Sequence, residues 1–277
     1  MATDRFSHAM ALQLEAVEVL AWQDLYRAAP RGLVEELGVA VQPLGSGCLS
    51  MVPKVDVLGM NRTFGMGLRE PVTRQQIAAL SETYRRAGCR RFFAQISPYA
   101  MPGELHHWLT EGGFSLYNNW VKLYRSVEDP QSAETDLSIQ RINSPGEFGT
   151  IVATAFGWPL QVAPWIAQSV GRQGWHHYMA FDGERPVATG AFFAAGEFAW
   201  LDLASTLPEA RERGAQSALL YRRAIDAAGA GCRWLTVETA EERPDNPAPS
   251  YRNMVRAGFR VAYNRPNYLF EFNPEGA

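Results

Sequence analysis

The sequence predicts an α+β fold of two domains, each with a mixed, mostly antiparallel sheet flanked by helices. The chain has 277 residues, which is the length of one large or two modest domains. Apolar runs of strand length alternate with stretches of helical spacing, and turns rich in glycine and proline separate them. Segments of the second half also repeat segments of the first, which indicates that one fold unit has been duplicated.

The repeat is clearest at two Ala-Gly-Cys-Arg segments, residues 87–90 and 230–233. Each precedes an apolar run of strand length, and a Gly-Phe pair follows further on in both halves. A polar, aperiodic segment at residues 126–136 is the expected linker. We therefore expect a first domain at residues 1–130 and a second at residues 131–277.

In the first half, helical spacing predicts a helix that ends at a Pro-Arg-Gly turn, and Thr73 with Gln76 forms a capping box for a second helix. Short apolar runs broken by glycine and proline predict an antiparallel meander between these two helices. The expected elements are a helix at 8–29, a meander at 39–68, a helix at 73–88, a strand at 91–97, a helix at 102–113 and a strand at 120–124.

In the second half, Ser144 and Glu147 form a second capping signal, and an Asp-Gly turn predicts a hairpin. The expected elements are a strand at 137–142, a helix from 144, a helix at 163–170, hairpin strands at 177–181 and 186–193, a strand at 198–204, a helix after 214, a strand at 231–238, a helix at 250–258, and strands at 260–263 and 268–272.

The segment between the strand at 198–204 and the next helix has the composition of a phosphate-binding turn. The first backbone N–H groups of a helix are unpaired and carry the positive end of its dipole, so they attract anions. Arg211 and Arg213 add positive charge, and Gly214 allows the backbone to approach a phosphate closely.

These residues carry a family resemblance. Arg211-x-x-Gly214-x-Gln216, followed by Ser-Ala-Leu-Leu, resembles the acetyl-coenzyme A pyrophosphate signature of the GNAT N-acetyltransferase superfamily, Gln/Arg-x-x-Gly-x-Gly/Ala. Gln216 departs from that pattern, because a longer side chain stands where the family has Gly or Ala. It either crowds the phosphate turn or reaches across to hydrogen-bond it. The order of elements from residue 198 to the C-terminus is also similar to the second half of a GNAT domain.

The resemblance implies a set of coenzyme-binding residues in the second domain. The strand end would hold pantetheine and polarise the thioester carbonyl through its main chain, and the turn would hold the pyrophosphate. The residues implied for the strand end, the turn and the following helix are Leu203, Ala204, Ser205, Thr206, Arg211, Glu212, Arg213, Gly214, Ala215, Gln216, Ser217, Asn246 and Asn253.

The resemblance leaves the general acid and base open. The tyrosine that often protonates the departing thiolate is Met254 here, so Tyr251 or Ser250 is a candidate substitute, and unassisted departure is the alternative. Glu238 and Asp202 are the carboxylates best placed to accept the amine proton, directly or through water. Two histidines, His176 and His177, are further candidates that equally fit a structural role.

In the first domain the corresponding turn lacks the signature. It carries Glu70, which would repel a pyrophosphate, and Pro71, which lacks an N–H. The resemblance therefore implies a tandem arrangement whose N-terminal copy is degenerate and does not bind coenzyme.

Three aromatic residues fall in the helix pair that covers the acceptor site in the resembled fold: Phe156, Trp158 and Trp165. Each either walls an amine pocket or belongs to the core.

Composition indicates a soluble globular protein, with 47% hydrophobic and 20% charged residues, and the net charge of −3 argues against nucleic-acid binding. No apolar run reaches membrane-spanning length, and residues 1–8 lack a signal-peptide core. The three separated cysteines indicate reduced, buried thiols in a cytoplasmic protein, and the histidines show no metal-ligand spacing.

The sequence thus predicts an acetyl-CoA-dependent N-acetyltransferase that acts on a small primary amine in its second domain, without a metal, a nucleic acid or a membrane. A non-catalytic acyl-CoA-binding or regulatory module is the main alternative, and a different acyl donor or a non-amine acceptor is another. The acceptor's identity and the oligomeric state stay open.

Overall fold

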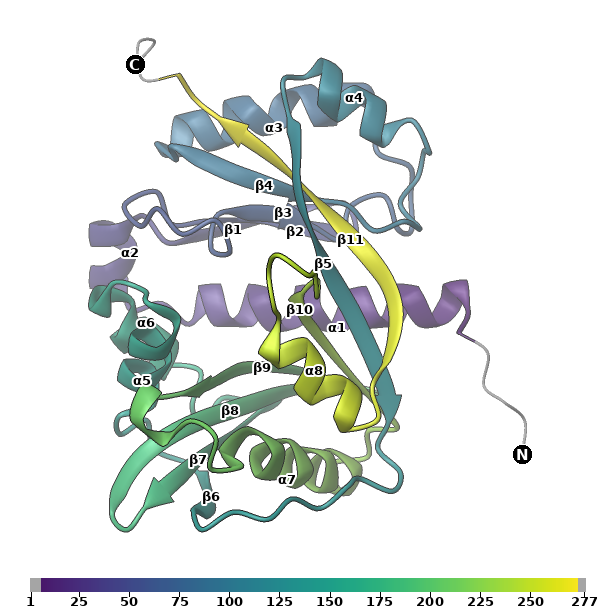
Figure 1. Cartoon of the computed structure of the whole chain (residues 1–277). Coiled ribbons are helices and arrows are strands. Elements are labelled where there is room, and N and C mark those ends of the chain that lie inside the picture. Colours follow the sequence, from purple (N-terminus) through teal and green to yellow (C-terminus); the bar gives the residue numbers. More distant parts are fainter. Residues whose placement is uncertain (1–5, 274–277) are drawn as a thin grey trace. The chain divides into compact units, whose positions relative to one another are not determined.

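The computed structural model describes residues 6–273, which divide into two compact units (Figure 1). The first unit holds the described residues up to Val121 and again from Ala262, and the second is Lys122–Val261. The expected division at residue 130 differs from this one, because the last residues of the chain pair with a strand of the first unit. Residues 1–5, part of the segment expected to lack a signal peptide, lie outside the described range.

The first unit contains a sheet with the order β1-β2-β3-β4-β11. Its pairs are antiparallel except for β3 with β4, so the expected meander is present. The helix α2 was not predicted from the sequence. The elements are α1 (His8–Arg27), α2 (Arg31–Leu37), β1 (Ala40–Leu44), β2 (Gly47–Met51), β3 (Arg62–Phe64), α3 (Arg74–Ala87), β4 (Arg91–Gln95), α4 (Leu105–Glu111), β5 (Ser115–Ser126) and β11 (Arg260–Glu271).

The start of α3 confirms the predicted capping box. The Thr73 hydroxyl accepts a hydrogen bond from Gln76 N at 3.2 Å, and Gln76 Oε1 accepts one from Thr73 N at 2.8 Å. Gly88 ends the helix in the left-handed conformation. The first turn of α3 therefore satisfies two of its own free N–H groups with side chains.

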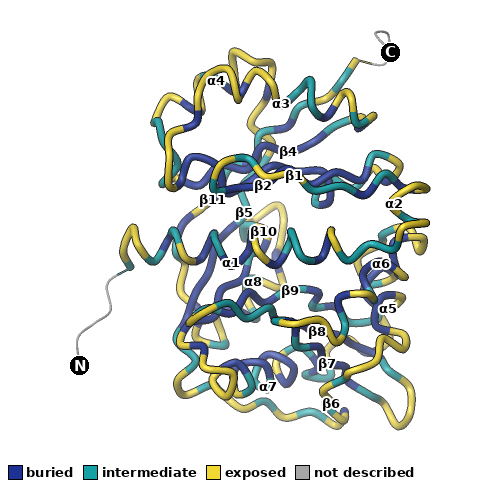
Figure 2. The backbone as a smooth tube through the Cα atoms, turned by 180° about the vertical axis from the view of Figure 1, so that it is seen from behind, coloured by how far each residue is buried: buried dark blue, intermediate teal, exposed yellow. Residues whose placement is uncertain are grey.

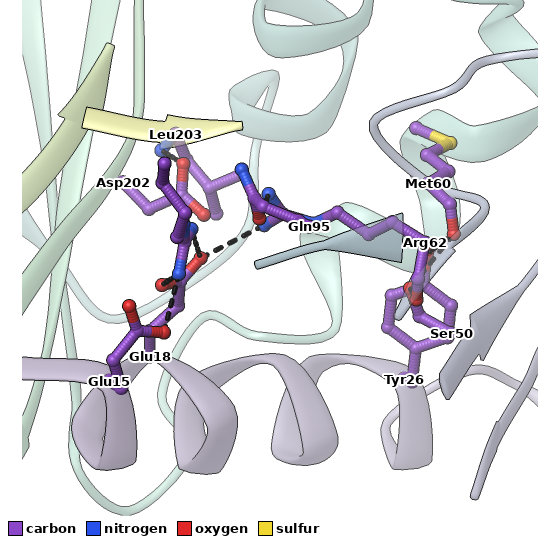
Figure 3. A network of polar contacts seen from close by, with 10 residues as sticks. Glu15, Glu18, Tyr26, Ser50, Met60, Arg62, Gln95, Asp202 and Leu203 are labelled. Carbon is purple, nitrogen blue, oxygen red and sulfur yellow. Dashed lines mark hydrogen bonds and ion pairs between the residues drawn. The ribbon is translucent and has the colours of Figure 1, made fainter. Parts of the chain in front are cut away.

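A buried charge network occupies the core of the first unit (Figure 3). Arg62 donates to Glu18 Oε1 at 3.2 Å and to Gln95 Oε1 at 3.1 Å. Arg265 donates to Glu15 Oε2 at 2.6 Å and to Glu18 Oε2 at 2.8 Å. All five side chains are at most 2% exposed. Each charge is therefore compensated inside the core, as burial requires.

The second unit contains the strand order β10-β9-β8-β7-β6, antiparallel except for β9 with β10. The fold is thus of the predicted α+β class, with a mostly antiparallel sheet flanked by helices. The elements are β6 (Ser138–Ile142), α5 (Phe148–Phe156), η1 (Leu160–Val162), α6 (Ala163–Ala167), β7 (Trp175–Asp182), β8 (Arg185–Ala195), β9 (Phe198–Thr206), η2 (Pro208–Ala210), α7 (Ala215–Gly229), β10 (Trp234–Ala240) and α8 (Pro249–Arg256).

Two sequence-based expectations were wrong in this half. Ser144 does not cap α5: Phe148 N donates to Pro145 O at 2.9 Å, so the chain first makes a turn, and the N-cap residue is Glu147 without a side-chain cap. The last two expected strands are one continuous strand, β11. Its Pro266 is tolerated because pairing with β4 begins at the next residue, Asn267.

Helices α5 and α7 cover opposite faces of the second unit's sheet. His177 and Tyr178 are adjacent on β7, so their side chains point to opposite faces. The His177 ring lies 4.8 Å from the Phe148 ring of α5, whereas the Tyr178 hydroxyl donates to Asp226 of α7 at 2.8 Å. The central strands β8 and β9 between the two helices are largely buried (Figure 2).

Helix α7 packs closely on β8 through Arg223, which is fully buried and donates to Ala191 O at 3.2 Å. Burial lowers the pKa of Arg223 to about 10. Gly190 makes room for it, since a Cβ there would lie 3.0 Å from the guanidinium carbon. This contact sets α7 against the sheet and so positions its N-terminus.

Strand β9 is irregular just before α7. Leu203 has φ 52°, an unusual value for a leucine, and the register with β8 shifts there. The parallel ladder of β9 with β10 joins Phe198–Trp200 to Trp234–Thr236. The last residues of β9 therefore lie beyond this ladder.

Candidate coenzyme site

A cavity of about 1000 Å³ lies within the second unit, where β9 ends and α7 begins. The described residues that line it come from the end of β5 and the segment after it, from α5, from the end of β9, from the turn into α7, from α7 itself and from β10 and α8. The expected linker at 126–136 is thus partly cavity wall, through Pro130, Gln131, Ser132 and Ala133.

The N-terminus of α7 opens into this cavity without a capping side chain. Ala215, Gln216 and Ser217 form its first turn and all line the cavity, and the first N–H group bonded within the helix is that of Ala218, which donates to Gly214 O at 3.0 Å. The unpaired N–H groups and the helix dipole favour an anion here. In the first unit, the start of α3 is capped by its own side chains. The backbone N–H groups of Thr73 and Gln76 are therefore not available to an anion.

Gly214 cannot carry a side chain in this turn. Its φ is 77°, and a Cβ would lie 2.4 Å from Glu134 O. The Thr135 hydroxyl donates to Arg213 O at 2.7 Å, and Glu212 has φ 65°. The segment before β6 thus holds the turn in a tight conformation, which the local sequence pattern does not reveal.

Gln216, the departure from the resembled signature, reaches across to the sheet. Its Nε2 donates to Ser205 O at 2.8 Å, to Thr206 Oγ1 at 2.9 Å and to Thr189 O at 3.3 Å. Ser205 and Thr189 also share a hydroxyl–hydroxyl hydrogen bond of 2.7 Å. The sequence left open whether this side chain crowds the phosphate turn or hydrogen-bonds it, and the bonds seen here go instead to β8 and to the end of β9.

The two arginines of the turn have different surroundings. Arg211 is exposed and lines the cavity, and no carboxylate within the described residues pairs with it. Arg213 is not among the lining residues: it donates to Asp182 at 2.6 Å and also pairs with Asp136. Hydrogen bonds to Asp182 and Asp136 raise the pKa of Arg213. Arg213 therefore braces the turn, and of these two arginines Arg211 is the one that lines the cavity.

Two further arginines in the cavity wall were not predicted from the sequence. Arg125 is 9% exposed and donates to backbone carbonyls, among them those of Ser126 at 2.8 Å and Glu128 at 2.6 Å. Burial lowers the pKa of Arg125. Arg256 of α8 donates to Asn253 Oδ1 at 2.6 Å. The available signal for Arg125 was an arginine directly after the apolar pair Leu123 and Tyr124.

The remaining predicted coenzyme residues fall into two groups. Ala204, Ser205, Thr206, Glu212 and Asn253 line the cavity. Leu203 is buried and its carbonyl accepts from the Thr189 hydroxyl at 2.8 Å, and Asn246 is exposed in a loop where it pairs with Arg243. Neither Leu203 nor Asn246 is among the lining residues.

Some of the candidate acid and base residues line the cavity and others do not. Ser250 and the buried Met254 line the cavity, whereas Tyr251, Glu238 and Asp202 do not. Asp202 Oδ1 accepts from Leu203 N at 2.7 Å. The structure therefore brings Ser250, but neither predicted carboxylate, to the cavity surface.

The two adjacent histidines lie outside the cavity lining as well. His177 is 1% exposed, its Nε2 lies 2.9 Å from Ser169 Oγ, and burial lowers its pKa to about 3. His176 stacks on Phe192, with ring centroids 4.3 Å apart. Both histidines are part of the packed sheet.

Of the three aromatic residues near the expected acceptor site, Trp165 is fully buried and belongs to the core. Phe156 lines the cavity and is 46% exposed. Trp158 stacks on Phe156, with centroids 4.7 Å apart and an interplanar angle of 16°. The exposed Phe156 thus stacks on the half-buried Trp158.

Within residues 6–273, no cluster of three or more His, Cys, Asp or Glu side chains could hold a metal ion. In the same part of the chain, no helix combines the length and the apolar character needed to cross a membrane. Cys48, Cys89 and Cys232 are buried free thiols, and burial raises the pKa of each.

Comparisons with solved structures bear on this arrangement. A GCN5-related N-acetyltransferase from Kribbella flavida superposes with a TM-score of 0.61 at 18% identity, covering 95% of this chain and 97% of that one. One from Sphaerobacter thermophilus gives 0.59 at 17% identity, covering 95% and 93%. The chain has the GNAT fold.

A tandem GNAT protein from the clavulanic acid biosynthesis pathway also has this fold, with a TM-score of 0.55 at 15% identity, covering 99% of this chain and 97% of that one. No family profile and no curated protein sequence matches the chain. At these identities the comparison establishes the GNAT fold.

Proposed function

We propose that the protein is an acetyl-CoA-dependent N-acetyltransferase, and that the second unit transfers the acetyl group directly to a small primary amine. The observation that carries this proposal is the N-terminus of α7, which has no side-chain cap and opens, together with the exposed Arg211, into a cavity of about 1000 Å³. Main-chain N–H groups of Ala215 to Ser217 would hold the pyrophosphate, and Arg211 would add charge.

The end of β9, beyond its ladder with β10, would hold the pantetheine arm and polarise the thioester carbonyl through main-chain groups of Ala204 to Thr206. The amine nitrogen attacks the carbonyl carbon, the carbon–sulfur bond breaks, and the thiolate gains the proton that balances the one lost by the amine. Ser250 is the candidate whose hydroxyl would donate that proton to the thiolate. Because Glu238 and Asp202 lie outside the lining, either would act on the amine through water.

In our proposal the first unit is a degenerate copy that binds no coenzyme. The start of α3 is occupied by its own capping box, and Glu70 would repel a phosphate from the preceding turn. The three unpaired thiols support a cytoplasmic protein. A small-molecule amine is then the expected partner, without nucleic acid or membrane, and the oligomeric state stays open.

Isothermal titration calorimetry with acetyl-CoA tests the coenzyme site, because one arginine lines the cavity and another on α7 does not. We expect Arg211→Ala to weaken binding about tenfold, the usual worth of a charge-assisted hydrogen bond. Arg222→Ala, which removes an arginine outside the lining that pairs with Asp226, should change the affinity much less. No binding to the native protein, or an equal loss in both variants, would contradict the proposed site.

A non-catalytic acyl-CoA-binding module is the second candidate. It is favoured by one observation: Met254 lines the cavity, and Tyr251 and both predicted carboxylates lie outside the lining. Turnover of acetyl-CoA with a panel of primary amines discriminates the two. Binding without turnover of any amine would favour the module.

A further inference from the structure

Phe156, the last residue of α5, presents an exposed aromatic ring to the cavity. It is 46% exposed, and Trp158 stacks behind it with an interplanar angle of 16°. Two nearly parallel rings hold each other in place, so the exposed face of Phe156 is a flat, preformed apolar surface. Such a surface costs free energy while it faces water and favours a flat apolar ligand.

The ring belongs to the part of the site built on β9. Helix α5 packs against β9, whose last residues Ala204–Thr206 line the same cavity. In the proposed function the thioester lies along that edge. The arginines Arg125 and Arg256 come instead from β5 and α8. Phe156 is therefore the large exposed apolar side chain on the element beside the reacting edge.

The charges of the cavity restrict the amine further. Among the described lining residues, Glu212 is the one acidic side chain, against Arg125, Arg211 and Arg256. A polyamine or a lysine-rich peptide carries several positive charges and would need several carboxylates. A ligand with a single amino group meets less repulsion.

We propose that the acceptor is a primary monoamine carried on a flat aromatic skeleton, an arylalkylamine whose ring stacks on Phe156 while Trp158 braces that ring. This inference rests on the proposed acetyltransferase function and names its substrate class. The products are the N-acetylated arylalkylamine and coenzyme A.

The test compares phenylethylamine, n-butylamine and spermidine as acceptors for the native protein, Phe156→Ala, Phe156→Tyr and Leu160→Ala. The native protein should acetylate phenylethylamine with the highest kcat/KM. Phe156→Ala should lower that value about tenfold, the worth of an aromatic stack, and Phe156→Tyr should retain it. Leu160 is 60% exposed but does not line this cavity, so Leu160→Ala should change little.

Calorimetry with acetyl-CoA alone separates this inference from the function on which it rests. We expect the native protein and Phe156→Ala to bind acetyl-CoA with dissociation constants within about twofold of each other. A loss of acetyl-CoA affinity in Phe156→Ala would place the coenzyme on the ring and overturn the inference. Acetyl-CoA binding with a preference for spermidine or n-butylamine, or without phenylethylamine turnover, would overturn it too. No acetyl-CoA binding by the native protein would instead refute the proposed function.

Discussion

Gln216 Nε2 donates a hydrogen bond to Ser205 O at 2.8 Å, so the first turn of α7 is bonded to the last residues of β9. The same amide donates to Thr206 Oγ1 and to Thr189 O, and so joins α7 to two strands. A side chain that replaces the usual glycine or alanine of the resembled signature thereby fixes the two elements between which the coenzyme is proposed to bind.

Substitution of Gln216 should show that the NH₂ donor of its side chain, rather than the size of the side chain, stabilises the protein. Gln216→Glu replaces the NH₂ by an oxygen that faces two carbonyls, so we expect the free energy of unfolding to fall by about 1–3 kcal/mol. Gln216→Ala should cost less, because it leaves the two carbonyls without adding a repulsive group. Urea denaturation measures both. A Gln216→Glu variant as stable as Gln216→Ala would contradict the donor role.

The buried charges of the first unit predict that substitutions of two glutamates lower the free energy of unfolding by very different amounts. Glu18→Ala removes the buried carboxylate that pairs with both Arg62 and Arg265, and should lower the free energy of unfolding by about 3–5 kcal/mol. Glu35→Ala removes an exposed pair with Arg31 and should cost at most about 0.5 kcal/mol. Similar losses in the two variants, measured by denaturant unfolding, would be inconsistent with the network.

The burial of His177 predicts that the free energy of unfolding depends on pH. Burial lowers its pKa to about 3, below the ordinary value of 6.5, so the unfolded chain takes up a proton first as the pH falls. Its contribution is complete above pH 6.5 and is lost progressively between about pH 6.5 and pH 3, by about 1.4 kcal/mol per pH unit.

The matched variant is His177→Gln, which does not titrate and keeps an amide near Ser169. Unfolding free energies from pH 7 to pH 4 should fall more steeply for the native protein than for this variant. Parallel pH profiles would show that His177 does not carry the dependence.

Ser250 and Tyr251 predict a difference in turnover, since one lines the cavity and the other does not. Ser250→Ala should lower kcat by about tenfold while the acetyl-CoA affinity changes little, because a positioned proton donor acts in the transition state. Tyr251→Phe should leave kcat near the native value. If Tyr251→Phe instead gave the larger fall, the assignment of the hydroxyl would be reversed.

Local signals in the sequence predicted local structure well. The capping box of Thr73 and Gln76 and the αL glycine at residue 88 both act within one turn of α3, and both are present. At Ser144 the same signal failed, because the Pro145 turn moved the N-cap position of α5 to Glu147. At Pro266 the chain continued as a strand, since its neighbours on β4 begin pairing at the next residue.

The cavity lining could be predicted where it depends on one contiguous turn, and not where it depends on packing. Spacing alone indicates Arg211 and Gly214, and both line the cavity. The involvement of Arg125 and of residues 130–133 depends on how the segment after β5 folds back beside α7, as the contact of Glu134 with Gly214 shows. The sequence predicts Arg213 as a further charge at the turn, because its partners, Asp136 and Asp182, are far away in sequence.

The most direct test of the account is thermal unfolding with and without acetyl-CoA, for the native protein, Ser217→Glu and Ser217→Gln. Ser217 is exposed in the first turn of α7 and lines the cavity. A glutamate there suits the helix dipole but repels a pyrophosphate, so it should fold and yet not bind.

Ligand at 100 times its dissociation constant adds about 2.7 kcal/mol, a shift of several degrees in Tm. We predict that shift for the native protein and for Ser217→Gln, and its absence for Ser217→Glu. An equal shift in all three proteins, or no shift in the native protein at millimolar ligand, would contradict coenzyme binding at the α7 N-terminus.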